Sequence, residues 1–274
     1  MARQLIVNAD DFGFTRDVNQ GIVEAHQRGI LTATTLMANG PAFDDAVRLA
    51  RENPRLDLGA HLVLVGGPLL SMPGKELPAG IPQLLAAIAA RRIRIYDELS
   101  AQVRRILDAG IRLTHLDTHK HTHLAPPVLE AVARVAEDSG ARWVRRPFDL
   151  PLTAARGGAP WLRRVTSDSL RVVRARFHRV LAEHRCRTTD HFAGFQITGR
   201  FQTRELVALI RALPEGSTEL MCHPGHATGE LRAARTRLKE SRERELAALT
   251  SPEARRALEE CGVQLVDYRL LEDR

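Results

Sequence analysis

Short apolar runs of strand length alternate with amphipathic stretches of helix length along the whole 274-residue chain. This alternation predicts an α/β protein with a mostly parallel sheet, because parallel strands need a crossover, usually a helix, between them. The expected strands span residues 4–9, 32–37, 56–64, 111–116, 143–145, 192–197 and 219–222. The expected helices span residues 15–28, 41–50, 84–90, 97–109 and a stretch from 126 onward, with a charged helical tail at 231–261.

About seven parallel strands with helical crossovers favour one α/β domain over residues 1–274, without a linker or an internal repeat. The leading architecture is a distorted (β/α) barrel similar to a TIM barrel. An open doubly wound sheet is the alternative, because no phosphate-binding glycine fingerprint distinguishes the two. With 44% hydrophobic residues the chain can fill a sizeable core.

The chain contains no apolar run of the roughly 20 residues that a membrane span needs, and a strand stands where a signal peptide would have its apolar region. A cytoplasmic protein with no transmembrane segment is therefore expected. The three cysteines, Cys186, Cys222 and Cys261, are far apart and odd in number, which is not typical of a disulfide framework or a zinc knot. We expect them to be small buried or half-buried residues.

The net charge of +7 comes largely from nine arginines between residues 156 and 187. Apolar residues at near-helical intervals among them predict an amphipathic helix with a basic, solvated outer face. Contact of that face with anionic lipid, nucleic acid or a partner is the alternative. No nucleic-acid partner is expected, and a homodimer is the default oligomeric state.

Polar residues collect where the predicted strands end, which is where ligands bind in parallel α/β domains. The first strand ends in Asp10 and Asp11, and the third contains His61. The middle strand runs into "HLDTHKHTH" at 115–123, and a late strand runs into "CHPGH" at 222–226. Seven of the chain's eleven histidines lie in these places.

The tract at 115–123 is the densest of these clusters. In an extended backbone, residues two apart share a face, so a common direction is expected for His115, Asp117, His119, His121 and His123. A catalytic zinc-type site needs about three imidazole or carboxylate ligands and an open position. Spacing alone does not choose among the four histidines.

Each cluster also has a purely structural interpretation. His61 fits a hydrogen-bonded core histidine, the two aspartates fit a helix N-terminus, and Pro224-Gly225 fits a tight turn. The joint placement of all four clusters at strand ends favours a metal-dependent active site.

Five motifs carry a family resemblance: "LIVNADDFG" at 5–13, "GILTATTLMANG" at 29–40, "LGAHLVL" at 58–64, "THLDTHKHTH" at 114–123 and "ELMCHPG" at 219–225. In their order and spacing the chain resembles the YdjC/ChbG/HpnK family of carbohydrate deacetylases. The resemblance runs from residue 4 to about 268 and is weakest between 150 and 190.

The resemblance implies a (β/α) barrel that removes the N-acetyl group from an N-acetylglucosamine-type sugar, with Asp11, His61 and His119 holding one divalent metal ion. Such a ligand set suits Zn²⁺, Mn²⁺, Co²⁺ or Ni²⁺, and Mg²⁺ less comfortably. Thr118 replaces the family's usual serine and keeps its hydroxyl. Lys120 stands where some members have histidine, so no role is transferred to that position.

The remaining roles follow from the chemistry of amide hydrolysis. Asp10 is expected to be the general base, and His223, with His226 as second choice, the general acid. His115 or Asp117 is expected to orient His119. His121 and His123 remain candidates for supporting the metal ligands or contacting the sugar.

The substrate stays open between a chitooligosaccharide, a peptidoglycan-type disaccharide and an N-acetylglucosaminyl glycolipid such as a hopanoid headgroup. The chain has only two Trp and two Tyr, which favours a short sugar. Residues 66–82 and 147–165 are expected to shape the pocket. The rival functions are another metal-dependent hydrolase on a barrel, such as a phosphoesterase or amidohydrolase, and an anionic-surface or nucleic-acid binding protein.

Overall fold

The structure is a computed structural model that describes residues 2–150 and 174–272. Its strands are β1 (Arg3–Phe12), β2 (Ala33–Leu36), β3 (Asp57–Leu62), β4 (His115–Thr118), β5 (Trp143–Val144), β6 (His191–Ala193), β7 (Gly216–Cys222) and β8 (Val263–Leu265). All paired strands are parallel, in the order β5-β4-β3-β2-β1-β7-β6, and β8 pairs with β1 beside this path.

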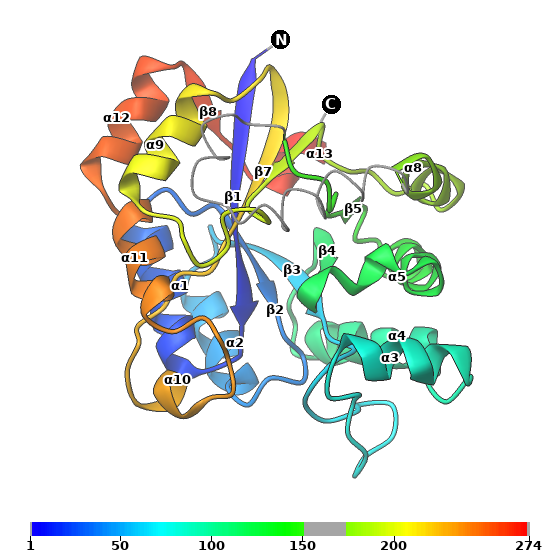
Figure 1. The fold of residues 1–274 in the computed structure, drawn as a ribbon. Helices are drawn as coiled ribbons and strands as arrows, with labels where there is room; N and C mark the ends of the chain where they lie inside the picture. Colours follow the sequence, from blue (N-terminus) through cyan, green and yellow to red (C-terminus); the bar gives the residue numbers. More distant parts are fainter. Residues whose placement is uncertain (1, 151–173, 273–274) are drawn as a thin grey trace.

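The seven strands of this path curl into a half-barrel (Figure 1). Two isolated parallel bridges, Trp143 with Arg187 and Asp149 with Phe192, connect the two ends of the curled sheet. β1 lies between β2 and β7, also pairs with β8, and is aligned with β7 from Arg3 opposite Gly216 onward. The prediction of a distorted α/β barrel with about seven parallel strands is therefore confirmed.

Helices follow one another around the outside of the sheet (Figure 1). They are α1 (Arg16–Arg28), α2 (Phe43–Glu52), α3 (Ile81–Ala89), α4 (Ile95–Asp108), α5 (Pro126–Ser139), α8 (Arg174–Glu183), α9 (Thr203–Arg211), α10 (Gly229–Ala233), α11 (Glu240–Leu249), α12 (Pro252–Glu260) and α13 (Tyr268–Glu272). Their apolar faces and the strands between them form one large core in which Leu5, Val7 and Ile22 are fully buried.

Local sequence signals set several of these boundaries. The Thr15 hydroxyl accepts a hydrogen bond from Val18 N at the start of α1, and Gly29 follows its end, as predicted. Pro126 opens α5, where a missing N–H costs nothing. The sequence did not predict β8 or α13, because both are short segments stabilised by tertiary pairing with β1 and β3.

The extended backbone expected for the histidine tract is wrong. β4 ends at Thr118, and His119–Leu124 form a short 3-10 helix. Lys120 and His121 there have φ of 56° and 52°, in the left-handed region. The alternation of side chains therefore stops at Thr118, and the five residues of the tract do not share a face.

Part of the arginine-rich stretch, residues 156–173, lies outside the described residues. In its described part, α8 buries Phe177, Val180 and Leu181 and exposes Arg174, Arg176 and Arg179, which agrees with an amphipathic helix. The thiol of Cys222 is buried and those of Cys186 and Cys261 are half-buried, and all three are free. Among the described helices, none combines the length and apolar character that crossing a membrane requires.

Candidate functional site

Asp10 and Asp11 lie near the C-terminal end of β1, at the edge of the sheet where the parallel strands end. The pairing of β1 with β2 is irregular between Ala9 and Phe12, and Asp11 has a φ of 70°, in the left-handed region. Aspartate adopts this conformation more readily than most residues. The bend interrupts the strict alternation of side chains, so both neighbouring carboxylates reach one cluster of polar groups.

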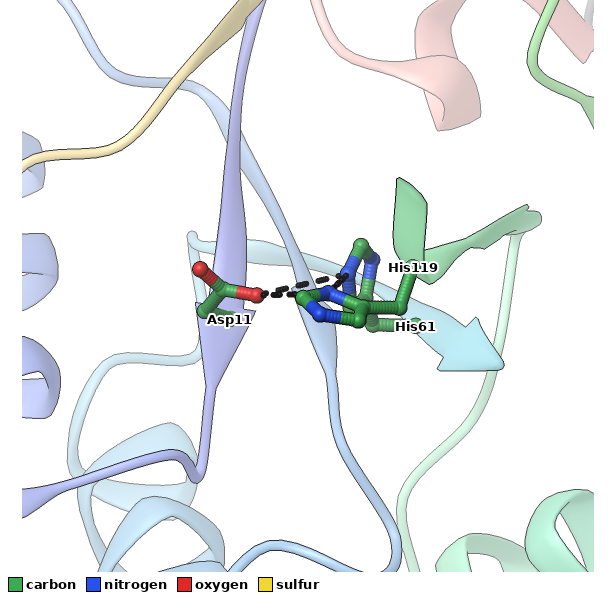
Figure 2. A group of neighbouring side chains, drawn as sticks. All are labelled: Asp11, His61 and His119. Atoms are coloured by element: carbon green, nitrogen blue, oxygen red, sulfur yellow. Dashed lines mark hydrogen bonds and ion pairs between the residues drawn. The ribbon is translucent and has the colours of Figure 1, made fainter. Parts of the chain in front are cut away.

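Three side chains from three elements converge on one point. The Asp11 Oδ1 atom lies 3.4 Å from His61 Nε2 and 3.4 Å from His119 Nδ1, and the two imidazole nitrogens are 3.2 Å apart. Figure 2 shows Asp11 on β1 facing the rings of His61 and His119. Asp11 and His61 are buried, whereas the His119 side chain is 28% exposed and leaves one side of the cluster accessible.

The donor set and its spacing fit a divalent cation. Zinc bonds to nitrogen and oxygen are about 2.0–2.1 Å long, so tetrahedral geometry places neighbouring donor atoms about 3.4 Å apart. The three observed separations, 3.2 to 3.4 Å, match that value. Asp11, His61 and His119 are also among the groups whose donor atoms lie close enough to hold one ion.

The surrounding charges also favour a cation. The buried carboxylates of Asp10, Asp11, Asp117 and Glu219 face two buried guanidinium groups, those of Arg145 and Arg242. With all six ionised, two negative charges remain in excess. Burial alone would lower the pKa of His61, but Asp117 and Asp10 outweigh burial and raise that pKa well above its usual value. Positive charge is therefore stabilised where the three donor atoms meet.

A second possible ligand group consists of Asp10, His61 and Asp117, but its carboxylates already form ion pairs with an arginine. Arg145 lies between its two carboxylates, with Nη2 2.6 Å from Asp10 Oδ1 and Nη1 2.6 Å from Asp117 Oδ2. His61 Nδ1 is 2.7 Å from the other Asp117 oxygen. Because the guanidinium already neutralises this group, the cluster around Asp11 is the better cation site.

Arg145 follows β5 and is the central cation of the site. It holds both oxygens of Asp10, at 2.6 and 2.8 Å, and its Nε donates to Glu219 Oε1 at 2.7 Å. Burial raises the pKa of Asp10, but the charges of Arg145 and His61 lower it further than burial raises it, so the net shift is downward. Asp10 is therefore an oriented, ionised carboxylate.

Asp117 orients His61 rather than His119. Its Oδ1 contacts His61 Nδ1, and its Oδ2 accepts a hydrogen bond from Thr35 Oγ1 at 3.1 Å. This arrangement leaves His61 Nε2 directed at the candidate cation site. The expectation that Asp117 orients His119 is therefore wrong, because Asp117 on β4 pairs across the sheet with His61 on β3.

His115 also does not orient His119. Its Nε2 is 2.9 Å from Asn8 Oδ1, its Nδ1 is 2.8 Å from Thr114 Oγ1, and its ring stacks on Tyr268. Burial is the first cause that lowers its pKa well below the usual value. His115 is thus a neutral structural residue of the core.

The two later histidines of the tract are buried beside the cluster. The His121 ring meets Phe192 and Phe195 edge-on, and His123 Nδ1 is 2.6 Å from Thr118 Oγ1. Burial lowers the pKa of His121 well below its usual value and that of His123 to about 3. Neither ring belongs to a ligand group among the described residues.

The two histidines of "CHPGH" lie in different surroundings. His223 Nε2 lies 3.9 Å from Asp10 Oδ2, and the residue is buried. His226 Nε2 instead contacts Glu24 Oε2 on α1 at 3.1 Å, with its side chain 38% exposed. Only His223 therefore adjoins the candidate base. Burial lowers the pKa of His223 to about 4, more than Asp10 and Asp11 raise it, so its ring is neutral at pH 7.

Four ionisable residues of the site were not predicted from the sequence: Arg145, its partner Glu219, Arg242, and Glu245, whose Oε2 accepts a hydrogen bond from His223 N. Arg145 could have been found by extending the strand-end rule to β5, whose last residue it follows. Arg242 and Glu245 lie on α11, whose sequence "ESRERELAAL" is typical of a solvated helix. The sequence carries no local signal for the burial of those two side chains.

The chain is similar to known proteins over nearly its whole length. A family model described as "YdjC-like protein" matches residues 4–260. A carbohydrate deacetylase of Geobacillus stearothermophilus is 37% identical over 98% of this chain and 98% of its own length. A carbohydrate deacetylase of Brevibacillus brevis is 32% identical over 97% of this chain and 98% of its own.

The fold also has a solved relative. A crystal structure from Enterococcus faecalis, named as a candidate cellobiose-phosphate cleavage protein, superposes with a TM-score of 0.75. It is 27% identical in sequence, and the superposition covers 99% of both chains.

Proposed function

The chain belongs to the YdjC-like family and is a carbohydrate deacetylase, and from this premise we propose that it hydrolyses the acetamide of an N-acetylglucosamine-type sugar. The reaction takes place where β1, β3 and β4 end. The observation that carries this proposal is the convergence of Asp11, His61 and His119 within 3.4 Å of one another, beside the carboxylate of Asp10.

Asp11, His61 and His119 would hold one divalent cation; two imidazoles and one carboxylate suit Zn²⁺ best, are also compatible with Mn²⁺, Co²⁺ or Ni²⁺, and suit Mg²⁺ less well. Such an ion supplies a Lewis acid that lowers the pKa of water and polarises the acetyl carbonyl. The chain's own part is to orient these donors, and Asp117 does so for His61.

Asp10 is the general base of the proposed reaction. Its carboxylate accepts a proton from the attacking water, and Arg145 fixes both carboxylate oxygens in advance. The same contacts keep the carboxylate ionised, because the positive charge of Arg145 opposes the effect of burial on the pKa. Arg145 is therefore a positioning residue for the base.

His223 delivers a proton to the departing amine. Its Nε2 adjoins Asp10 Oδ2 at 3.9 Å, and the ring is neutral before the reaction. The proton that leaves water therefore passes from Asp10 to His223 and then to the sugar nitrogen as the carbon–nitrogen bond breaks. This path consumes one water and yields acetic acid and the amine, and the acid ionises to acetate by giving its proton to the amine or to solvent. The enzyme itself returns to its starting protonation.

A metal-supplemented assay tests the proposal. The purified chain, stripped with a chelator and reloaded with one metal at a time, is incubated with short N-acetylglucosamine oligomers, an N-acetylglucosaminyl glycolipid and a generic phosphate ester, and acetate and phosphate are measured. We expect metal-dependent acetate release from at least one sugar. Phosphate release without acetate would instead support the phosphoesterase alternative.

A further inference from the structure

We propose that Arg242, on α11, is a positioning residue of the metal site that holds Asp11 as a ligand through one oxygen only. This inference rests on the proposed function of Asp11 but concerns a residue outside the ligand set. The inference rests on one contact: the fully buried guanidinium of Arg242 binds Asp11 Oδ2, the oxygen that does not face the two imidazoles.

The two oxygens of Asp11 have different partners. Oδ1 lies 3.4 Å from the facing nitrogens of His61 and His119, whereas Oδ2 accepts a hydrogen bond from Arg242 Nη2. Figure 2 shows one Asp11 oxygen directed at the imidazoles and the other turned away from them. The Arg242 side chain is 1% exposed, and its Nε donates to Leu238 O at 3.3 Å, which fixes the guanidinium from behind.

Two glycines make room for this arginine. A Cβ added to Gly225 would lie 3.2 Å from the Arg242 Cδ, and one added to Gly21 would lie 2.4 Å from the Gly225 Cα. Neither glycine has a φ in the left-handed region, so close approach, rather than backbone conformation, explains both. The glycine of "CHPG" thus lets the chain after β7 pack against the stem of Arg242.

The contact has a definite consequence for the ligand. A charge-assisted hydrogen bond from a guanidinium to one carboxylate oxygen opposes rotation of the carboxylate and favours binding of an ion through the other oxygen. Asp11 is therefore oriented before an ion binds, and the binding reaction does not have to order it. Partners that hold metal ligands in this way typically contribute about 10–100-fold in metal affinity or activity.

The experiment compares metal affinity, measured by competition with a chromophoric chelator, for the wild-type chain and the variant Arg242→Met. Methionine fills much of the volume of the arginine stem without its donors. We expect Zn²⁺ affinity to fall about 10–100-fold and Arg242→Lys, which restores a charged donor, to recover part of that loss. Arg244→Met, an exposed arginine of the same helix, is the matched control and should bind as the wild type does.

Two further measurements separate a positioning role from general destabilisation. In an Asp11→Asn background, Arg242→Met should weaken Zn²⁺ affinity much less than it does in the wild type, because the carboxylate through which Arg242 acts is already absent. If Arg242→Met does not fold, Gly225→Ala replaces it, since the added methyl displaces the Arg242 stem by a few tenths of an ångström and should also weaken binding.

Unchanged or tighter Zn²⁺ binding by folded Arg242→Met would overturn the inference. So would an equal loss in the Asp11→Asn background. Failure of the proposed function looks different: the wild-type chain would then bind the metal no better than Asp11→Asn does, whatever residue stands at position 242.

Discussion

At the scale of single residues, each of the two adjacent carboxylates in the site forms an ion pair with its own arginine. Asp10 is held by Arg145 and Asp11 by Arg242, and these arginines come from separate parts of the sequence. Opposite charges within about 4 Å favour the ionised carboxylate and offset the repulsion between neighbours. The left-handed backbone at Asp11 brings both carboxylates into one cluster, where Asp11 Oδ1 faces the two imidazoles and Asp10 Oδ2 lies 3.9 Å from His223 Nε2.

This division of roles predicts that Asp10→Asn keeps its metal and loses turnover. The asparagine cannot accept the proton of water, so we expect kcat for acetate release to fall about 10²–10⁴-fold. Metal content, measured by elemental analysis, should match the wild type, because the cluster around Asp11 is intact. Asp44→Asn, an exposed aspartate on α2, is the control. Full activity in Asp10→Asn would remove Asp10 from the mechanism.

Residue by residue, the sequence predicted the groups that parallel topology brings together. Asp10, Asp11 and His61 could be selected because strand ends meet at one edge of a parallel sheet. The choice of His119 came from family resemblance, since spacing favoured no one histidine of the tract. Arg242 could not be selected, because a buried arginine on a charged helix has the same local sequence pattern as an exposed one.

At the scale of elements, the close approach of β3 and β4 aligns the site. A Cβ added to Gly59 would lie 2.5 Å from the carbonyl oxygen of His115 and 2.6 Å from its ring. His61 and Asp117 are opposite each other in the same strand pair, so their hydrogen bond depends on this spacing.

We therefore predict that Gly59→Ala destabilises the fold by about 1–3 kcal/mol, because a methyl group forced into a packed strand pair must displace its neighbours. Urea denaturation followed by circular dichroism measures the loss. Gly229→Ala is the control, since a Cβ there meets nothing within 4 Å. Equal stability of Gly59→Ala and the wild type would show that β3 and β4 can separate without cost.

Element boundaries were predictable where capping residues or proline set them, as for α1 and α5. The end of β4 was not, because the turn at Lys120 and His121 uses the left-handed conformation without a glycine. A run of alternating histidines looks like a strand, and only tertiary packing makes it turn.

At the scale of the whole molecule, the C-terminal segment is attached to the start of β3 through Asp57. Asp57, on β3, accepts hydrogen bonds from Tyr268 N and Thr114 Oγ1, and Arg269 Nε lies 3.7 Å from it. Burial, followed by the negative charge of Asp267, raises the pKa of Asp57 to about 7 despite these contacts.

A raised carboxyl pKa makes the fold less stable as pH rises. Between the usual value of 3.8 and about 7, the folded chain retains a proton at Asp57 that the unfolded chain releases. Stability should therefore fall across this window and level off above it, by on the order of a few kcal/mol. Asp149 and Glu245, whose pKa values burial also raises to about 7, act in the same direction.

Asp57→Asn should accordingly reduce the slope of unfolding free energy against pH between about 4 and 7 without abolishing it. Urea titrations at several pH values, for the variant and the wild type, measure the difference. Asp267→Asn is a useful companion, because removing the negative neighbour should shift the window toward lower pH. An identical slope in Asp57→Asn and the wild type would contradict the assignment.

The pairing of β1 has a consequence for the order of events during synthesis. β1 leaves the ribosome before any other strand, but two of its neighbours, β7 and β8, begin at Gly216 and Val263, and the partner of Asp11 is residue 242. While most of the chain is translated, β1 therefore has one unpaired edge, and its two carboxylates lack their arginine partners. Long-range pairings of this kind fold slowly, so the strand that carries both carboxylates of the site is also one of the last to complete its pairing.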